Sequence, residues 1–326
     1  MRKLRIVMVG AGDIAKRLAR SSEASRARWY GLARTKESAD ALRTCGILPI
    51  RADLDVRATL LRSAAVARSA HATCYFAPPP NTGNDDPRMR YWIAAVSKPL
   101  VVSSTQRHKM QRKTQHEKPA QKKRRMRMNR CVYISTTGVY GDRAGAWVNE
   151  TSKTFATSAR SKRRVAAESR LRNHRQHHVC ILRAPGIYAA ERLPIERLRG
   201  GTPALLATED VFTNHIHADD LAHAAWLAMF RGRSHRVLNI VDDAKLKMGE
   251  YFDTVAGALG LPKPPRLSRL MLQREVTPML YSFMSESRRI DNARMKRELR
   301  IRLRYATPQL MLAQMKPSDA LQQSLI

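Results

Sequence analysis

The chain begins with a short apolar segment that leads directly into a glycine-rich turn. Residues 4–9 are rich in β-branched side chains, and Gly10-Ala11-Gly12-Asp13-Ile14-Ala15 follows at once. A strand, then G-x-G-x-x-A, then an amphipathic helix is the arrangement that binds the pyrophosphate of a dinucleotide. Gly10 permits the tight turn, Gly12 lets the backbone approach the pyrophosphate, and the helix N-terminus attracts the anion. Residues 10–14 are therefore the predicted phosphate-binding turn.

Strands and helices alternate along the rest of the chain. We predict strands at 27–33, 47–50, 72–77, 131–135, 179–183 and 237–241, and helices at 14–24, 56–67, 88–97, 158–174 and 222–230. This alternation predicts an α/β fold with a doubly wound parallel sheet. A chain of 326 residues can hold one such domain together with a smaller appended lobe.

The charge balance is unusual for a globular enzyme. The chain has 60 Lys and Arg residues against 27 Asp and Glu residues, a formal net charge of +33. Much of the excess is spread singly along predicted helices, but residues 107–130 form one strongly basic run. Such a run is usually a mobile loop or the extended end of a helix. Polyanion binding, and with it a nucleic-acid partner, is the less favoured alternative.

Composition also limits the class of protein. No apolar run reaches the roughly 18 residues that a membrane span requires, and the N-terminal apolar segment continues into the glycine turn without a cleavage-like site. We therefore expect a cytoplasmic protein with no membrane contact. The four cysteines are scattered, which favours reduced, buried thiols over disulfides or a metal site: Cys45, Cys74, Cys131 and Cys180.

Polar residues after the second and third predicted strands indicate how a dinucleotide would be held. Arg34 stands where a carboxylate would bind the ribose 2′-hydroxyl of NAD, and an arginine there suits a 2′-phosphate, so NADP is the preferred cofactor and NAD the alternative. Asp53-Leu54 follows the third strand, where the carboxylate could accept a hydrogen bond from adenine. Ala77-Pro78-Pro79 ends the fourth strand at the edge against which the dinucleotide would lie.

With these elements in place, the chain resembles the extended short-chain dehydrogenase/reductase superfamily, in particular its atypical NAD-dependent epimerase/dehydratase-like members. The resemblance covers nearly the whole chain. It is carried by Gly10-x-Gly12-x-x-Ala15, Asp53-Leu54, and the motifs at residues 134–141, 182–188, 215–222 and 286–292.

The resemblance implies a Rossmann domain and a small C-terminal substrate lobe. The expected nucleotide-binding domain spans residues 1–183, carries a basic insertion at 106–130, and regains residues 213–241. Residues 184–212 and 242–326 would form the substrate-binding cap. The family also implies a homodimer built from paired helices that include residues 158–174, although the arginines on this helix weaken that expectation.

Catalysis in this family uses a Ser or Thr, a Tyr and a Lys. The Tyr transfers a proton, the Lys lowers the pKa of the Tyr, and the Ser or Thr hydroxyl positions the reacting oxygen. Thr136 matches the hydroxyl position. Counted back from Glu168, the Tyr and Lys positions are Arg160 and Arg164, and an arginine, with a pKa above about 12, cannot act as a general acid near neutral pH.

Three alternatives follow for proton transfer. Tyr140 or Tyr188 supplies the proton, Lys162 moves into the pocket, or the protein binds the dinucleotide without turnover; Arg164 could still hold the ribose or an acidic substrate. Both tyrosines more often serve packing in these motifs.

The remaining polar residues concern the substrate and the cap. Arg183 and Arg192 are candidate anion clamps beside Tyr188, although Arg183 at a strand end could equally form a structural ion pair. His215 and His217 lack further ligands for a metal, so packing is favoured and no metal site is predicted. Arg300 replaces an expected helix-ending glycine, which costs about 1 kcal/mol where φ is positive.

The leading hypothesis is an NADP-dependent oxidoreductase or epimerase-like protein. Its substrate would be a small molecule, free or nucleotide-linked, with a reacting hydroxyl or carbonyl that Thr136 orients. The first alternative is a non-catalytic NADP-binding sensor or scaffold, which the missing Tyr-x-x-x-Lys pair favours. The second alternative is a nucleic-acid-associated protein that uses the basic run at 107–130.

Overall fold

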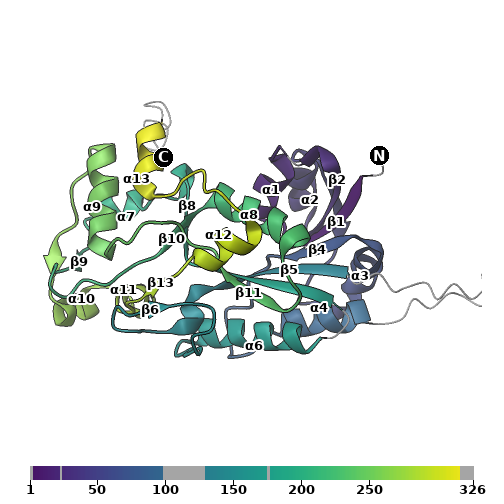
Figure 1. The fold of residues 1–326 in the computed structure, drawn as a ribbon, viewed down its shortest axis with the longest axis horizontal. Coiled ribbons are helices and arrows are strands. Elements are labelled where there is room, and N and C mark those ends of the chain that lie inside the picture. The colour runs from purple at the N-terminus through teal and green to yellow at the C-terminus, as the bar shows by residue number, and fades with distance from the viewer. Residues whose placement is uncertain (1–2, 23, 98–128, 175–176, 316–326) are drawn as a thin grey trace, which may run out of the picture.

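A computed structural model describes residues 3–22, 24–97, 129–174 and 177–315 of the chain (Figure 1). Almost all of the basic run at 107–130 lies outside the described residues, so its predicted role is not addressed by the structure. Among the residues that the structure describes, no helix is both long enough and apolar enough to cross a membrane.

The core of the molecule is a seven-stranded sheet in which every pairing is parallel. Its order is β11-β7-β5-β4-β1-β2-β3, which confirms the predicted Rossmann-like α/β fold. The strands are β1 (Leu4–Val9), β2 (Ala27–Ala33), β3 (Ile47–Arg51), β4 (Ala72–Tyr75), β5 (Asn129–Thr136), β7 (His177–Ala184) and β11 (Arg236–Asn239).

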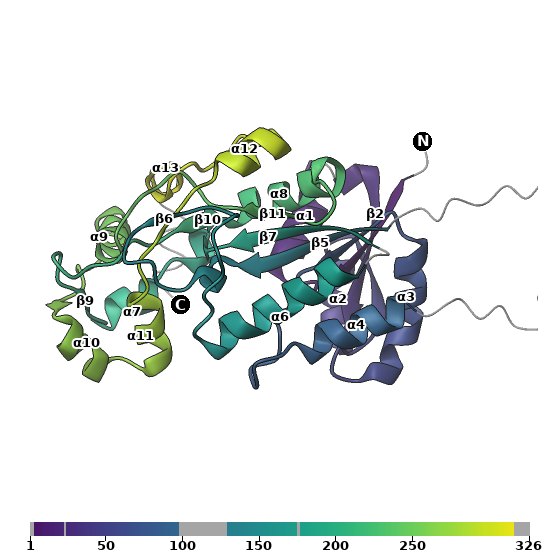
Figure 2. The ribbon, with the colours of Figure 1, turned by 60° about the horizontal axis from the view of Figure 1, so that its bottom comes forward.

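Helices cover both faces of this sheet (Figure 2). One face carries α1 (Asp13–Arg20), α8 (Ala218–Arg231) and α12 (Ala293–Leu299); the other carries α3 (Leu60–Ser69), α4 (Pro87–Ser97) and α6 (Ala159–Asn173). Because both faces are buried, the central strands are apolar on both sides, as parallel sheets require.

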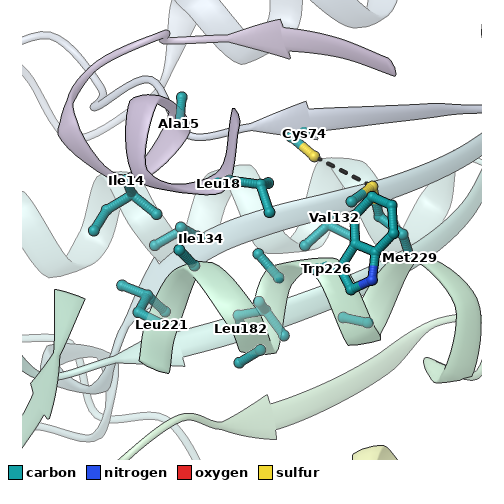
Figure 3. Close-up of a cluster of buried hydrophobic side chains, with 14 of the residues drawn as sticks. Ile14, Ala15, Leu18, Cys74, Val132, Ile134, Leu182, Leu221, Trp226 and Met229 are labelled. Carbon is teal, nitrogen blue, oxygen red and sulfur yellow. Dashed lines mark hydrogen bonds between the residues drawn. The ribbon is translucent and has the colours of Figure 1, made fainter. Parts of the chain in front are cut away.

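The core under α1 and α8 is densely packed. Ile14 and Leu18 of α1 and Leu221 of α8 meet strand residues such as Val132 (Figure 3). The Cys74 Sγ atom contacts the Met229 Sδ atom at 3.5 Å. All four cysteines are buried and free, as predicted.

Between the second and third strands lies a helix that was not predicted. α2 (Lys36–Arg43) lies between β2 and β3 and buries only Leu42. The Thr35 side chain accepts the Ser38 backbone N–H, and the Ser38 hydroxyl oxygen accepts the Thr35 backbone N–H. This local capping stabilises the short polar helix.

A second core lies beyond the carboxyl ends of the strands. It contains Tyr188, Leu198, Phe252 and Met284 among others. Its elements are β8 (Gly186–Tyr188) paired with β10 (His215–His217), β9 (Ala204–Leu205) paired with β12 (Arg266–Leu267), α7 (Ile195–Arg199), α9 (Met248–Leu259), α10 (Arg269–Glu275), α11 (Pro278–Met284) and α13 (Pro308–Gln314).

Short elements complete the connections. A two-stranded sheet joins β6 (Trp147–Val148) to β13 (Arg289–Ile290), and single 3-10 turns occur at η1 (Ala24–Arg26), η2 (Arg57–Thr59), η3 (Thr137–Tyr140) and η4 (Ala190–Arg192).

The C-terminal region does not all belong to this second core. Met295 and Leu299 of α12 join the core beneath α8, although the expected cap extended from residue 242 to the C-terminus. Arg300 ends α12 with φ +50°, in the left-handed conformation predicted for this position.

The turn after β1 generates a stability prediction. Gly10 has φ +85°, and a Cβ atom there would lie 2.2 Å from the Ala77 backbone nitrogen. We expect Gly10→Ala to destabilise the protein by at least about 2 kcal/mol, measured by urea unfolding. Gly257 in α9 has open space around it, so Gly257→Ala should stabilise by about 0.5–1 kcal/mol. An unchanged unfolding midpoint for Gly10→Ala would contradict this account of the turn.

Candidate functional site

The first candidate site is a cleft of about 380 Å³ at the carboxyl edge of the sheet. The glycine turn and the ends of β2, β3 and β4 form its walls. Eight of the residues predicted to bind the cofactor line it together: Gly10, Ala11, Gly12, Arg34, Asp53, Leu54, Ala77 and Pro78.

Three other predicted cofactor residues do not line this cleft. Ile14 packs in the core beneath α1, and Pro79 is buried. The Asp13 side chain turns instead toward Arg17 and Arg192, which lie 3.0 Å and 2.9 Å from its oxygens. Asp13 therefore connects the glycine turn to the cap through ion pairs.

The glycine turn fits a pyrophosphate group. Gly10 lets β1 pass close to Ala77, and no atom of the described residues lies within 4 Å of the position that a Cβ of Gly12 would occupy. Gly12 immediately precedes α1, so the free N–H groups of the first helical turn face this open space. The backbone therefore provides the room and the donors that a dinucleotide needs.

Beyond the glycine turn, the first cleft is lined by charged side chains of both signs. Arg34 is exposed beside the capped N-terminus of α2. The position directly after β2 is thus occupied by an arginine and not by a carboxylate. Arg88, which the sequence analysis missed, donates to Asp55 at 2.6 Å and to the Pro78 carbonyl at 3.1 Å. The Arg88 guanidinium lowers the pKa of Asp55 below its ordinary value. In the sequence, the only indication of Arg88 as a site residue was its position at the start of a predicted helix, after the proline-rich segment.

The second candidate site is a cleft of about 350 Å³ between η3 and the second core. Thr136 lines it, and its Oγ1 atom accepts the Gly138 backbone N–H at 3.1 Å. Arginines gather in its walls: Arg160, Arg192, Arg197 and Arg288.

Arg160 and Arg164, which occupy the two positions of the missing Tyr-x-x-x-Lys pair, have different surroundings. The Arg160 guanidinium lies 3.9 Å from the centre of the Phe283 ring, within the wall of the second cleft. The Arg164 Nη1 atom instead donates to the Ile134 carbonyl at 2.9 Å and to the Tyr133 hydroxyl at 3.1 Å. Arg164 is thus bound to β5 and does not line the second cleft.

Neither candidate tyrosine directs its hydroxyl into the cleft. Tyr140 is fully buried and donates to Asn239 at 2.8 Å, and burial raises its pKa. The Tyr188 ring lines the cleft, but its hydroxyl donates to the Tyr305 carbonyl at 3.2 Å, and burial raises its pKa as well. We therefore assign both hydroxyls to packing and remove them from the candidate proton donors.

Arg183 is not an anion clamp. It is 2% exposed and forms two hydrogen bonds with Glu168, at 2.6 Å and 3.0 Å, and Glu168 also accepts the Ser135 hydroxyl at 2.6 Å. The structural alternative, an ion pair at the strand end, describes this residue correctly. The sequence could not decide between these roles, because Glu168 lies 15 residues away on α6.

The two histidines have structural partners. The His217 Nδ1 atom accepts the Asp219 N–H and caps α8, and the His215 ring stacks on Tyr251 with 4.1 Å between centroids. Burial lowers the pKa of each histidine to about 4, so both are neutral near pH 7. Asp220, in the first turn of the same helix, accepts the backbone N–H groups of residues 304 and 305.

Comparison with known proteins bears on the fold. No family profile matches the chain, and no curated protein sequence matches it. The solved structure of a functionally unknown conserved protein from Silicibacter pomeroyi is similar, with 25% identity, a TM-score of 0.70 and 99% coverage of both chains.

Two of the structural neighbours were solved with a bound dinucleotide. MoeE5 in complex with UDP-glucose and NAD is 18% identical, with a TM-score of 0.69 over 99% of this chain and 100% of that chain. Human epimerase family protein SDR39U1 with NADPH is 15% identical, with a TM-score of 0.63 over 95% and 98%. Several other structural neighbours are described as epimerases or dehydratases and align over nearly their full length, so the predicted resemblance is confirmed for the fold.

The buried ion pair generates a prediction. Glu168→Gln should destabilise the protein by about 3 kcal/mol, because it leaves the Arg183 charge buried without a counterion. Glu196, which pairs with Arg199 and has an 80% exposed side chain, is the matched control; Glu196→Gln should cost less than about 0.5 kcal/mol. Urea unfolding measures both. Equal small losses would show that the Glu168 pair contributes no more than a surface contact.

Proposed function

From a fold shared over nearly its full length with NAD-dependent epimerases and dehydratases, we propose that the chain binds NADP along the first cleft. We further propose that it acts in the second cleft on a hydroxyl or carbonyl of a small substrate, as an oxidoreductase or epimerase-like protein. The observation that carries the proposal is the open space at Gly12 beside the N-terminus of α1, at the edge where β1 and β4 end.

The preference for NADP rests on Arg34. Its exposed guanidinium at the end of β2 suits a 2′-phosphate, and the capped start of α2 lies next to it. Structural neighbours have been solved with NAD and with NADPH, so the fold alone does not select between the two.

The chain's own residues would orient the substrate and stabilise charge. The Thr136 hydroxyl accepts a backbone N–H and keeps its proton available for the substrate oxygen. Bound NADP would supply or accept the hydride. Arg160 could stabilise negative charge on the reacting oxygen but cannot release a proton near neutral pH. We therefore expect turnover to be slow.

A non-catalytic NADP-binding protein is the second candidate. It is favoured by the arginines at both dyad positions, because Arg164 is bound to β5 and Arg160 carries no transferable proton. In this role the second cleft would bind a ligand without changing it.

The cofactor proposal predicts the effect of Arg34→Asp. Calorimetric titration with NADPH, NADP, NADH and NAD should show tighter binding of the phosphorylated forms to the wild type. Arg34→Asp should weaken NADPH binding about tenfold or more, since it replaces an attractive charge by a repulsive one, and should spare NADH. An unchanged preference would remove Arg34 from the site.

Gly12→Val is the control for this titration. The valine side chain would occupy the open space beside α1 and should weaken all four dinucleotides alike. If no dinucleotide binds to the wild type, the Rossmann-like fold serves this chain only as a scaffold.

The catalytic proposal predicts the effect of Thr136→Val. We would follow the oxidation of bound NADPH with a panel of small carbonyl compounds. Thr136→Val should slow any oxidation by about 100-fold because the orienting hydroxyl is lost, whereas Thr136→Ser should retain most of the rate. A wild type that binds NADPH but oxidises none of it with the panel would favour the non-catalytic candidate.

A further inference from the structure

Two arginines of the second cleft have no carboxylate partner among the described residues. Arg160 projects from the start of α6 and Arg197 from α7, and within the described part of the chain neither forms an ion pair. Arg160 is exposed and accessible to a ligand, and Arg197 is half-buried. Arg192 and Arg288, the other two arginines that line this cleft, each pair with an acid.

Both guanidinium groups converge on the C-terminal end of α11. Arg160 lies 3.9 Å from the Phe283 ring centre, and the Arg197 Nη2 atom lies 2.9 Å from the sulfur of Met284, the next residue. Arg197 also lies 4.5 Å from the centre of the Phe252 ring. Each charge is therefore held against an apolar surface in the wall of the same cleft.

The surrounding carboxylates do not neutralise this pair. Among the described residues that line the second cleft, Glu286 is the only acid, and it accepts Arg288 at 2.7 Å. Arg192 is paired with Asp13 at 2.9 Å. Glu286 also attracts the Arg160 guanidinium, but one carboxylate cannot balance Arg160, Arg197 and Arg288, so the cleft keeps an excess of positive charge.

The environment of Arg197 adds to this imbalance. Its Nε atom is buried without a hydrogen-bond acceptor among the described residues, and burial lowers the pKa of Arg197 from the ordinary value. A buried guanidinium N–H without an acceptor costs free energy unless a ligand anion satisfies it. A bound anion would supply the missing acceptors.

We propose that the second cleft binds the carboxylate or phosphate group of a small ligand between Arg160 and Arg197, with the apolar part of the ligand against Phe252 and Phe283. The assignment of this ligand as a substrate rests on the proposed function; the anion site itself does not. The position where the family resemblance places a proton-donating tyrosine thus becomes an anion-binding position in this chain.

Calorimetry with inorganic phosphate and with malonate, with and without saturating NADPH, tests the proposal on the full chain. Arg160→Gln and Arg197→Gln should each weaken anion binding about tenfold or more. Arg172→Gln on α6 and Arg199→Gln on α7 remove one charge from the same helices, at residues that do not line the cleft, and should leave the affinity unchanged. Stronger binding of phosphate or of malonate identifies the preferred anionic group.

The outcomes separate the two proposals. Equal weakening in all four variants would mean that the anions respond only to the high net charge, and no binding of either probe to the wild type would equally overturn the site. Anion binding that depends on Arg160 and Arg197 in a protein that binds no NADPH would uphold this inference and refute the proposed function. If Arg197→Gln unfolds, as thermal unfolding would reveal, Arg160→Gln alone decides.

Discussion

The ion pair between Glu168 and Arg183 connects the main parts of the structure. It joins α6 to β7, and Ser135 adds a hydrogen bond from β5. Residues four apart lie on one face of a helix, so anchoring Glu168 also directs Arg164 and Arg160 along the same face. Arg164 consequently meets the Ile134 carbonyl, and Arg160 reaches the second cleft. One buried pair therefore determines what α6 presents to the site.

The first cleft depends on a different constraint, the close approach of two backbones. Gly10 passes within contact distance of Ala77 because it has no side chain, and this brings the ends of β1 and β4 together. The open space at Gly12 then lies directly beside α1. Both features depend on backbone geometry and on the absence of side chains at the two glycines. They therefore do not depend on the charge of the surrounding surface.

The second cleft combines a retained hydroxyl with replaced proton donors. Thr136 keeps its position at the end of β5, whereas both dyad positions carry arginine. Arginine preserves the positive charge of a lysine but cannot release a proton near neutral pH. The arrangement therefore favours the binding of an anionic group over rapid proton transfer. Both candidate functions and the proposed anion site are consistent with this property.

All seven strands of the main sheet could be predicted from the sequence, since buried parallel strands are apolar runs between turn signals. The glycine turn and the absence of the Tyr-x-x-x-Lys pair were equally evident. The short helix α2 was missed because its stability comes from capping by Thr35 and Ser38, with only Leu42 buried. Partners distant in the chain were decided only by the tertiary structure: Glu168 pairs with Arg183, Asp13 pairs with Arg192, and Arg160 and Arg197 have no acidic partner among the described residues. Local patterns specify which residues carry charge, but only packing brings a charge to its counterion or leaves it without one.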